Sequence, residues 1–508
     1  SSGDRVAKLM PPMILGNTAT ISECLSLDEE NTSGYSKEFY SASEELRKQY
    51  KNDEEAKQII DIALGLEGLR RQDGIHAAAI VISPDTITKF LPIQQKGSNA
   101  EIVTQYEMHT VEQLGLLKMD FLGLRNLSIV DRTLELIGSE SLDIDNLKLD
   151  DEKTFKLFAE GKMTGVFQLE SRVAQSTSRS LKPKRFEDIV ALVALIRPGP
   201  LGAGMHNEFA DRANNRKEIE YLHNDLESIL NETYGVILYQ EQVMQIAEKI
   251  AGFNLQEADN LRVAMGKKIP KVMEEQRKKF TDGAVSNNYS EQFAIELFDQ
   301  IAYFAGYGFN KSHSVPYALL AYQTAYLKAN YPAEYIAACL TAVKRDKDRT
   351  AIFLSEARDM GVKVSTPDIN LSSSDFTVND NEILFGLSAV RNVGDITADK
   401  IVLERESNGH FESIEDFLSR IDSRSLNKRG VEALIQGGGL DKFGLTRKGM
   451  FDSAIELIEN AKELKANKEN NQGSLFEMED SNSTHININN TEWDKKELLE
   501  REREMLGF

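Results

Sequence analysis

The chain has 508 residues, a formal net charge of −21 and two cysteines, Cys24 and Cys339, which lie far apart. This length exceeds what one hydrophobic core usually serves, so we expect about three to four domains. The cysteine pattern argues against a disulfide framework or a zinc site and favours a reducing, cytoplasmic setting. Because no apolar run reaches about 18 residues, we expect no membrane-spanning helix.

The acidic balance disfavours nucleic-acid binding by the surface as a whole, because phosphate binding needs local positive potential. Two stretches run against this balance. Residues 178–186 are basic, and Arg262 to Lys279 contains seven Lys or Arg against two Glu. A large acidic enzyme can still carry a basic channel, although a solvated helix face also explains a single charge run.

The first 125 residues change from a helical to a strand pattern. Apolar residues at helical spacing from Glu44 to Leu69 predict helices within residues 1–74. Ala77 to Ser83 is a continuous apolar run, which predicts a buried strand. Leu116 to Phe121 predicts a second strand.

The remaining chain is predicted to be mainly helical up to residue 345, and then to mix short strands with helices. Residues 464–492 are rich in Asn, Lys and Glu and contain little that could form a core, so they predict a flexible linker. Residues 493–508 predict a charged helix.

Gly306 to Ser314 is the stretch with the densest ligand chemistry. It combines glycines with Asn310, Lys311, Ser312 and His313, and an apolar helical run follows at once. So many hydrogen-bonding groups are not expected in a loop that only packs in the hydrophobic core. The pattern predicts an element that grips a phosphate and a ribose at a helix.

Eight segments resemble, in the same order, segments of the bacterial DNA polymerase III alpha subunits, the C-family of replicative DNA polymerases. They are Gly74–Ala78, Val103–Tyr106, Lys118–Leu124, Gly165–Ser171, Arg197–Leu201, Tyr234–Gln242, Ala264–Lys268 and Gly306–Ser314 with its following helix. One short motif is a weak signal, but eight in order leave little room for coincidence.

The resemblance implies a multidomain α+β fold that is mainly helical. The implied parts are a thumb (1–74), the C-terminal part of a palm (75–125), fingers (126–345), a helix-hairpin-helix DNA- and clamp-binding domain (346–463), the linker (464–492) and a truncated charged helix (493–508). The family's N-terminal phosphatase-like domain and the first part of its palm have no counterpart here. We therefore expect an internal fragment of a longer chain.

Asp120 lies in a strand-like apolar run, where a carboxylate needs a strong reason to be. By resemblance it is a ligand of the two Mg²⁺ ions that the polymerase reaction uses. Lys118, on the same strand face, would neutralise developing phosphate charge. The structural alternative is an Asp that pairs with Lys118 or caps a loop. The family's two further aspartates lie in a Pro-Asp-x-Asp-x-Asp-Phe element that is absent here, so this stretch alone should be nearly inactive.

The resemblance also implies a set of nucleotide contacts. They are Arg197, Arg262, Lys267, Lys268, Asn310, Lys311, Ser312 and His313. A guanidinium suits bidentate contact with phosphate. Val263 stands where many family members carry a second arginine. The alternatives are an exposed helix end for the two lysines and a cap partner at a helix start for His313.

Leu387 to Val402 resembles a helix-hairpin-helix, in which backbone amides of a hairpin meet a DNA phosphate without reading sequence. The implied DNA contacts are Arg391, Val393, Gly394, Thr397 and Lys400. This hairpin is short of glycine, because Asn392 and Ile396 stand where such hairpins often carry it. An ordinary helical hairpin is the alternative.

Gln472, Ser474, Leu475 and Phe476 lie in the predicted linker and resemble the short peptide by which replication proteins hold the sliding clamp. A disordered linker suits such a peptide, because it must be free to dock. Pentapeptides of this kind also recur by chance.

The implied activity is DNA-templated DNA synthesis on primer-template DNA from deoxynucleoside triphosphates, with Mg²⁺ as cofactor. The implied partners are the sliding clamp, a separate proofreading exonuclease subunit and the clamp-loader subunits, all in the cytoplasm. Two alternatives remain: a non-catalytic DNA- and clamp-binding scaffold, and an error-prone relative of the same family.

Overall fold

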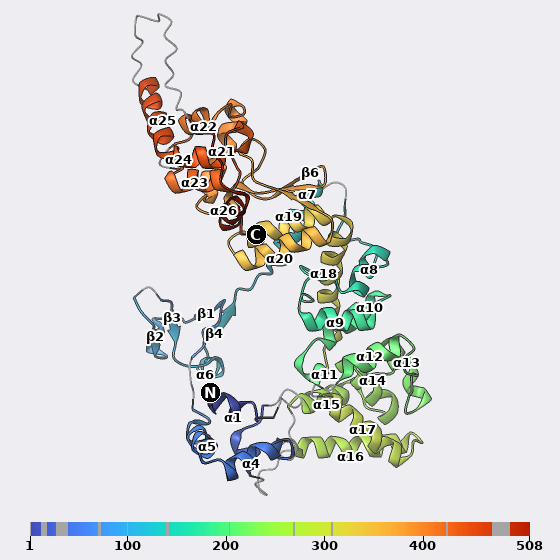
Figure 1. Cartoon of the computed structure of the whole chain (residues 1–508). Helices are drawn as coiled ribbons and strands as arrows, with labels where there is room; N and C mark the ends of the chain where they lie inside the picture. Colours follow the sequence, from blue (N-terminus) through green and yellow to red (C-terminus); the bar gives the residue numbers. More distant parts are fainter. Residues whose placement is uncertain are drawn as a thin grey trace, which may run out of the picture. The chain divides into compact units, whose positions relative to one another are not determined.

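The computed structural model describes residues 2–11, 18–26, 39–69, 73–98, 100–138, 142–202, 204–267, 270–305, 308–422, 425–469 and 488–507. The fold is mainly helical α+β and divides into two compact units, Ser1–Leu124 and Arg125–Phe508, each considered by itself (Figure 1). Across the described residues, no helix is long and apolar enough to cross a membrane.

The first unit begins with the helices α1 (Ser2–Ala7), α2 (Ile21–Leu25), α4 (Glu44–Asn52) and α5 (Glu54–Leu66). Asp53 accepts hydrogen bonds from the amides of Glu55 and Ala56. This cap starts α5 and divides the predicted helical stretch into two helices. The apolar faces meet in a small core formed by Val6, Cys24, Leu46, Ala56 and Ile60.

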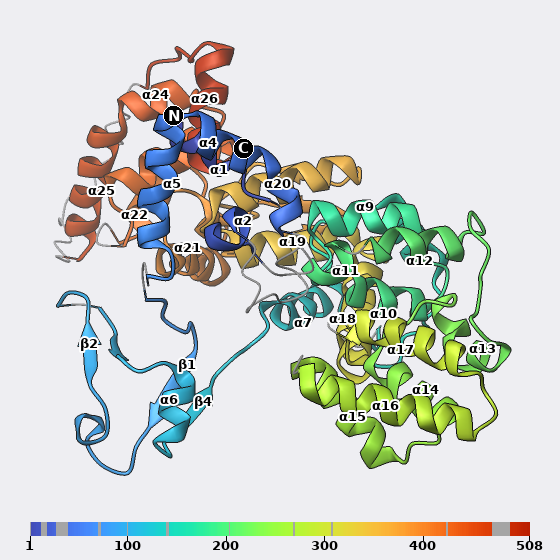
Figure 2. The ribbon, with the colours of Figure 1, turned by 90° about the horizontal axis from the view of Figure 1, so that it is seen from below.

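Two antiparallel strand pairs complete the first unit. Strand β1 (Ala79–Ile82) pairs with β4 (Leu117–Asp120), and β2 (Ile93–Gln95) pairs with β3 (Ile102–Thr104). Figure 2 shows β1 and β4 side by side, with helix α6 (Met108–Gln113) next to them. The predicted strand at Leu116 to Phe121 is thereby confirmed as β4.

The prediction of a buried strand at Ala77 to Ser83 is wrong in its burial. The inward face of β1 packs Val81 against a small cluster that includes Val111. Its outward face is open, because Ile80 is 56% and Ile82 is 45% exposed. A continuous apolar run predicts two covered faces, whereas one face of this two-stranded sheet is covered by the described residues of the unit.

The second unit starts with helices that pack against the long helix α18 (Lys311–Asn330) or against one another. They are α7 (Arg125–Ile137), α8 (Glu152–Glu160), α9 (Arg172–Leu181), α10 (Phe186–Leu195), α11 (Pro198–Gly202) and α12 (Met205–Ala213). Helix α10 is buried from Asp188 to Leu195 and packs along α18. The core around them includes Leu192, Tyr239 and Phe309.

A separate core belongs to the helices between residues 224 and 305. They are α13 (Glu227–Leu230), α14 (Gln240–Ala251), α15 (Leu255–Lys267), α16 (Pro270–Ser286) and α17 (Glu291–Ala305). Ile246, Phe280 and Phe298 are almost fully buried in it.

The C-terminal part of the second unit surrounds a third core. Its helices are α19 (Pro332–Val343), α20 (Lys347–Asp359), α21 (Asp395–Asn408), α22 (Ile414–Arg420), α23 (Lys428–Gln436), α24 (Arg447–Asp452), α25 (Ala454–Glu469) and α26 (Lys495–Leu506). A three-stranded sheet of β5 (Lys363–Ser365), β7 (Glu382–Leu384) and β6 (Thr377–Asn379) lies among them.

The structure corrects both ends of the predicted linker at 464–492. Helix α25 continues to Glu469, and residues 470–487 lie outside the described residues. From Ile488 the chain is again bound to the domain, because Glu492 accepts hydrogen bonds from the amides of Arg447 and Lys448. The sequence-based boundary missed these contacts because they join residues more than 40 positions apart.

Candidate active site

The two predicted catalytic residues meet at the end of β4. Lys118 Nζ donates to both carboxylate oxygens of Asp120, at 2.8 and 2.9 Å. The hydrogen bond from Lys118, helped by its charge and that of His76, lowers the pKa of Asp120. Asp120 is therefore a carboxylate at neutral pH. This ion pair is the contact that the structural alternative for Asp120 predicts.

His76 is a neighbour of Asp120 that the sequence reasoning missed. Its Nε2 atom lies 3.6 Å from Asp120 Oδ1, and its Nδ1 atom accepts a hydrogen bond from the Ala78 amide. The signal was present, because His76 lies within the family-like segment Gly74–Ala78. No chemistry was assigned to it there, since nothing in the local pattern indicates that it returns beside β4.

Among the described residues, Asp120 is not joined by the further ligands of a two-metal site. Such a site needs several hard oxygen ligands. In the described parts of the chain, no group of three or more His, Cys, Asp or Glu side chains is placed to hold a metal ion. Asp120 supplies one carboxylate, and both of its oxygens accept hydrogen bonds from Lys118.

Arg197 and His313, two of the predicted nucleotide contacts, meet on Phe309 in the second unit. The Arg197 guanidinium lies 3.7 Å from the centre of the Phe309 ring, and His313 meets the same ring edge to face at 5.5 Å. His313 also stacks on Tyr317 at 4.4 Å. Burial lowers the pKa of Arg197. The buried Phe309 thus supports a cation and an imidazole at the start of α18.

The position of Phe309 is fixed by a backbone bridge to Tyr239. The Phe309 amide donates to the Leu238 carbonyl at 3.1 Å, and the Gln240 amide donates to the Phe309 carbonyl at 2.9 Å. The Gln240 side chain adds a hydrogen bond to the Gly308 carbonyl at 3.1 Å. Burial, followed by the charges of Glu232 and Glu241, raises the pKa of Tyr239, so this phenol stays neutral.

Asn310 and Lys311 make contacts within the protein. Asn310 caps α18, because its Oδ1 atom accepts from the His313 amide at 2.7 Å. Lys311 Nζ forms an ion pair with Glu232 Oε2 at 2.7 Å. Ser312 and His313 are exposed. The helix start therefore presents a hydroxyl and an imidazole to solvent, while its amide and ammonium side chains are engaged.

The second predicted group lies along α15. Arg262 Nε donates to Asp259 Oδ1 at 2.8 Å, and its Nη1 atom lies 3.5 Å from Gln240 Oε1. Lys267 is the last residue of α15, and Lys268 lies outside the described residues. Arg262 thus connects α15 to Gln240, whose side chain donates to the Gly308 carbonyl.

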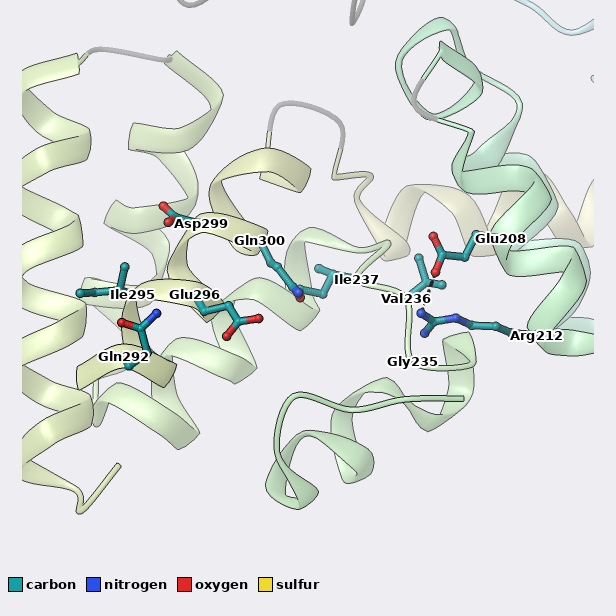
Figure 3. A pocket seen from close by; sticks show the side chains of 10 residues that line it. All are labelled: Glu208, Arg212, Gly235, Val236, Ile237, Gln292, Ile295, Glu296, Asp299 and Gln300. Carbon is teal, nitrogen blue, oxygen red and sulfur yellow. Dashed lines mark hydrogen bonds and ion pairs between the residues drawn. The ribbon is translucent and has the colours of Figure 1, made fainter. Parts of the chain in front are cut away.

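A cavity of about 540 Å³ lies between α12 and α17, over Gly235, Val236 and Ile237 (Figure 3). Three carboxylates, from Glu208, Glu296 and Asp299, line it together with the guanidinium of Arg212. This balance of charge disfavours a triphosphate. None of the predicted nucleotide contacts among the described residues lines this cavity, so it is not the candidate nucleotide site.

Three of the predicted DNA contacts of the hairpin, Arg391, Thr397 and Lys400, form hydrogen bonds to other residues of the chain. Arg391 Nη1 donates to Glu504 Oε1 of α26 at 2.6 Å, and Val393 is buried. Thr397 Oγ1 and Lys400 Nζ both donate to Ser425, at 2.7 and 2.6 Å. Gly394 precedes α21 as its N-cap and is exposed, so its backbone faces solvent.

The predicted clamp-binding residues Gln472, Ser474, Leu475 and Phe476 lie outside the described residues. Both flanks of the segment return to the same domain. Helix α25 packs on α22 before it, and after it Trp493 meets the Phe451 ring at 5.5 Å.

Three parts of the chain match known families. Residues 6–123 match the bacterial DNA polymerase III alpha NTPase domain, residues 126–288 match the bacterial DNA polymerase III alpha subunit finger domain, and residues 361–450 match a helix-hairpin-helix motif. These matches follow the two units, since the first ends at Gly123 and the second begins at Asn126.

Whole-chain relatives agree with these matches. The chain is 41% identical over 520 residues to the DNA polymerase III subunit alpha of Saccharopolyspora erythraea, a match that covers 99% of this chain and 43% of the relative. The corresponding subunit of Thermus aquaticus is 43% identical over 471 residues, covering 91% of this chain and 38% of the relative. That of Vibrio cholerae is 40% identical over 521 residues, covering 99% and 43%.

The chain spans 38–43% of the length of these relatives. The matched families occur in the order of the described units, and the similarity runs through almost the whole sequence. The chain therefore belongs to the family of bacterial DNA polymerase III alpha subunits.

Proposed function

We propose that this chain is part of a DNA-directed DNA polymerase that copies the chromosome by transferring nucleotides from deoxynucleoside triphosphates to a primer 3′-hydroxyl. The observation that carries the proposal is the similarity over 99% of the chain to subunits named DNA polymerase III subunit alpha. Because the chain spans less than half of these relatives, the complete reaction is assigned to a subunit that contains this stretch.

In this proposal the start of α18 and the end of α15 receive the incoming nucleotide. Arg197, Arg262, Lys267 and Lys268 supply positive charge for the triphosphate. The exposed Ser312 and His313 supply a hydroxyl and an imidazole for the sugar and phosphates. Support comes from Phe309, which brings Arg197 and His313 onto one ring.

Asp120 is the proposed metal-binding carboxylate, and Mg²⁺ is the proposed cofactor. In nucleotidyl transfer such ions neutralise phosphate charge and activate the attacking hydroxyl. Lys118 orients the Asp120 carboxylate through two hydrogen bonds and keeps positive charge beside it. The remaining metal ligands are assigned to residues of the complete subunit other than the described ones.

Primer-template DNA is the proposed nucleic-acid partner, with the turn at Gly394 contacting phosphate through its backbone. Leu475 and Phe476, with Gln472 and Ser474, are proposed to bind the sliding clamp. Replacing Leu475 and Phe476 by Ala should abolish clamp binding and leave unstimulated synthesis unchanged. Proofreading and clamp-loader subunits are further proposed partners in the cytoplasm.

The proposal is tested by primer extension with the complete subunit that carries this stretch. Asp120→Asn should lower nucleotide incorporation by about 100-fold or more, because it removes a charged ligand from the reacting centre. Asp85→Asn is the matched control, since Asp85 pairs with Lys89 on the surface of the same unit. Full activity of Asp120→Asn would show that Asp120 is not a metal ligand.

A non-catalytic DNA- and clamp-binding scaffold is the second candidate. It is favoured by one observation, that Lys118 engages both oxygens of the candidate metal ligand. A scaffold would bind DNA and clamp but give no metal-dependent incorporation with the wild-type subunit. An error-prone relative would incorporate nucleotides, and its misincorporation rate would distinguish it.

A further inference from the structure

We infer that Glu241, together with Gln240, is a positioning residue that fixes the start of α18 and so places Ser312 and His313 for the incoming nucleotide. This inference rests on the proposed function and deepens it. Glu241 belongs to the family-like segment Tyr234–Gln242, whose sequence alone predicts no chemistry for it. Its role follows from where its carboxylate lies.

The Glu241 carboxylate occupies the N-terminus of α18. The Lys311 amide donates to both of its oxygens, at 3.0 and 2.9 Å, and the Ser312 amide donates to Oε1 at 3.4 Å. The next amide, that of His313, donates to Asn310. The first three amides of α18 therefore each have an acceptor supplied by the protein.

This arrangement changes what the helix start can do. An N-terminus with free amides and a positive dipole end attracts an external anion. Here the internal Glu241 carboxylate already accepts hydrogen bonds from the amides of Lys311 and Ser312, so these amides are not free to bind phosphate. The triphosphate must then be met by side chains around the helix start, namely Arg197, Ser312 and His313.

Lys311 belongs to the same internal network. Its ammonium is paired with Glu232 at 2.7 Å and lies 5.5 Å from the centre of the Tyr239 ring. Glu232 thus binds the Lys311 side chain, and Glu241 binds the Lys311 backbone amide. The charge of Lys311 is compensated within the protein, and the same ion pair anchors α18.

Gln240 completes the anchor. Its backbone amide and side chain donate to Phe309 and Gly308, directly before the helix start. The anchor therefore joins the N-terminus of α14 to the N-terminus of α18 across about 70 residues of sequence. Since Arg197 and His313 both rest on Phe309, a shift of this anchor moves the two groups together.

The test is primer extension and amide hydrogen exchange with the complete subunit. Glu241→Gln keeps one acceptor oxygen but turns an amide group toward the donors of α18. We expect the KM for deoxynucleoside triphosphate to rise about tenfold, which corresponds to about 1.4 kcal/mol. The kcat and the KM for primer-template DNA should change less than about twofold, and exchange should accelerate in peptides covering residues 308–317.

Glu248→Gln is the matched control, because it removes the same charge from the same helix. The Glu248 side chain has no hydrogen-bond or ion-pair partner within the described chain. It should leave both the nucleotide KM and the exchange rates at the wild-type values. An unchanged nucleotide KM in Glu241→Gln, with or without faster exchange, would overturn the positioning role.

A second variant distinguishes the positioning role from a general loss of folding. Gln240→Leu removes the side-chain contacts to Gly308 and Arg262 without changing charge. It should raise the nucleotide KM and also accelerate exchange in residues 308–317, while the circular dichroism spectrum stays that of the wild type. If Glu241→Gln unfolds and Gln240→Leu has the wild-type KM, the inference fails. If the wild-type subunit shows no metal-dependent incorporation, the proposed function fails instead, which is a distinct result.

Discussion

Arg391 of the hairpin donates to Glu504 of α26 at 2.6 Å, and the Arg391 amide donates to the carbonyl of the next residue, Met505, at 3.0 Å. A cation expected to meet DNA is thus held by the last helix of the described chain. DNA phosphate and Glu504 would compete for the same guanidinium.

Glu504→Gln should therefore strengthen DNA binding by freeing Arg391 and removing a nearby negative charge. We expect a Kd about twofold to fivefold lower for a primer-template duplex at low salt, in the range of one exposed ion pair. Fluorescence anisotropy measures the Kd. Trp493, the single tryptophan, reports whether α26 stays in place. Glu500→Gln is the control, because Glu500 pairs with Lys496 on the same helix. Equal affinity of Glu504→Gln and wild type would show that Arg391 does not contact DNA.

Arg197→Lys should weaken nucleotide binding although the charge is kept. A lysine ammonium is not planar, so it cannot stack on the Phe309 ring as the guanidinium does. It also loses the bidentate contact with phosphate. We expect the nucleotide KM of the complete subunit to rise about tenfold. Arg216→Lys tests the substitution itself, since Arg216 pairs with Asp211 on the surface. A KM within twofold of wild type would remove Arg197 from the nucleotide site.

Lys328→Met should destabilise the second unit strongly. The Lys328 side chain is 1% exposed, pairs with Glu356 at 2.6 Å, and donates to the carbonyls of Lys162 and Thr164. Removing it leaves a nearly buried carboxylate without its cation, at a cost of about 3–5 kcal/mol. Urea unfolding measures the loss. Lys363→Met breaks an exposed pair with Glu382 and should cost less than about 1 kcal/mol. Similar losses for both variants would contradict the buried ion pair.

The two cysteines should report the two units separately. Burial raises the pKa of Cys24 and raises that of Cys339 to about 12, so both thiols stay protonated and unreactive in the folded protein at pH 8. Cys24 belongs to a small core and Cys339 to a large one. With rising urea, alkylation should therefore begin at Cys24 in a Cys339→Ser variant at lower concentration than at Cys339 in Cys24→Ser. Simultaneous reaction would mean that the units unfold together.

The Cys339 thiol makes the free energy of unfolding depend on pH in a defined direction. The folded state holds the Cys339 proton more tightly than the unfolded chain, whose thiol has a pKa near 9.0. Its contribution to the free energy of unfolding is therefore present below pH 9.0 and falls as the pH rises toward about 12. A Cys339→Ala variant should lose this part of the pH dependence in urea unfolding.

The sequence predicted local structure better than it predicted contacts. Strand β4 lies within Leu116 to Phe121 as expected, because an apolar run with two polar residues on one face is a local signal. The exposure of Ile80 and Ile82 was missed, since a sequence pattern does not say what covers a face. The roles of Glu232 and Glu241 were also missed, because both contact Lys311 from at least 70 residues away.

The bridge between Tyr239 and Phe309 has a consequence for how such chains diverge. The chain enters α14 and returns from α17 at two hydrogen-bonded neighbours, and the helices between them have their own core. A segment whose ends meet in this way can lengthen, shorten or be exchanged by recombination without shifting the rest of the fold. Length variation among relatives should therefore be tolerated between residues 270 and 305, which follow the proposed nucleotide contacts of α15, while Arg197 and His313 keep their place.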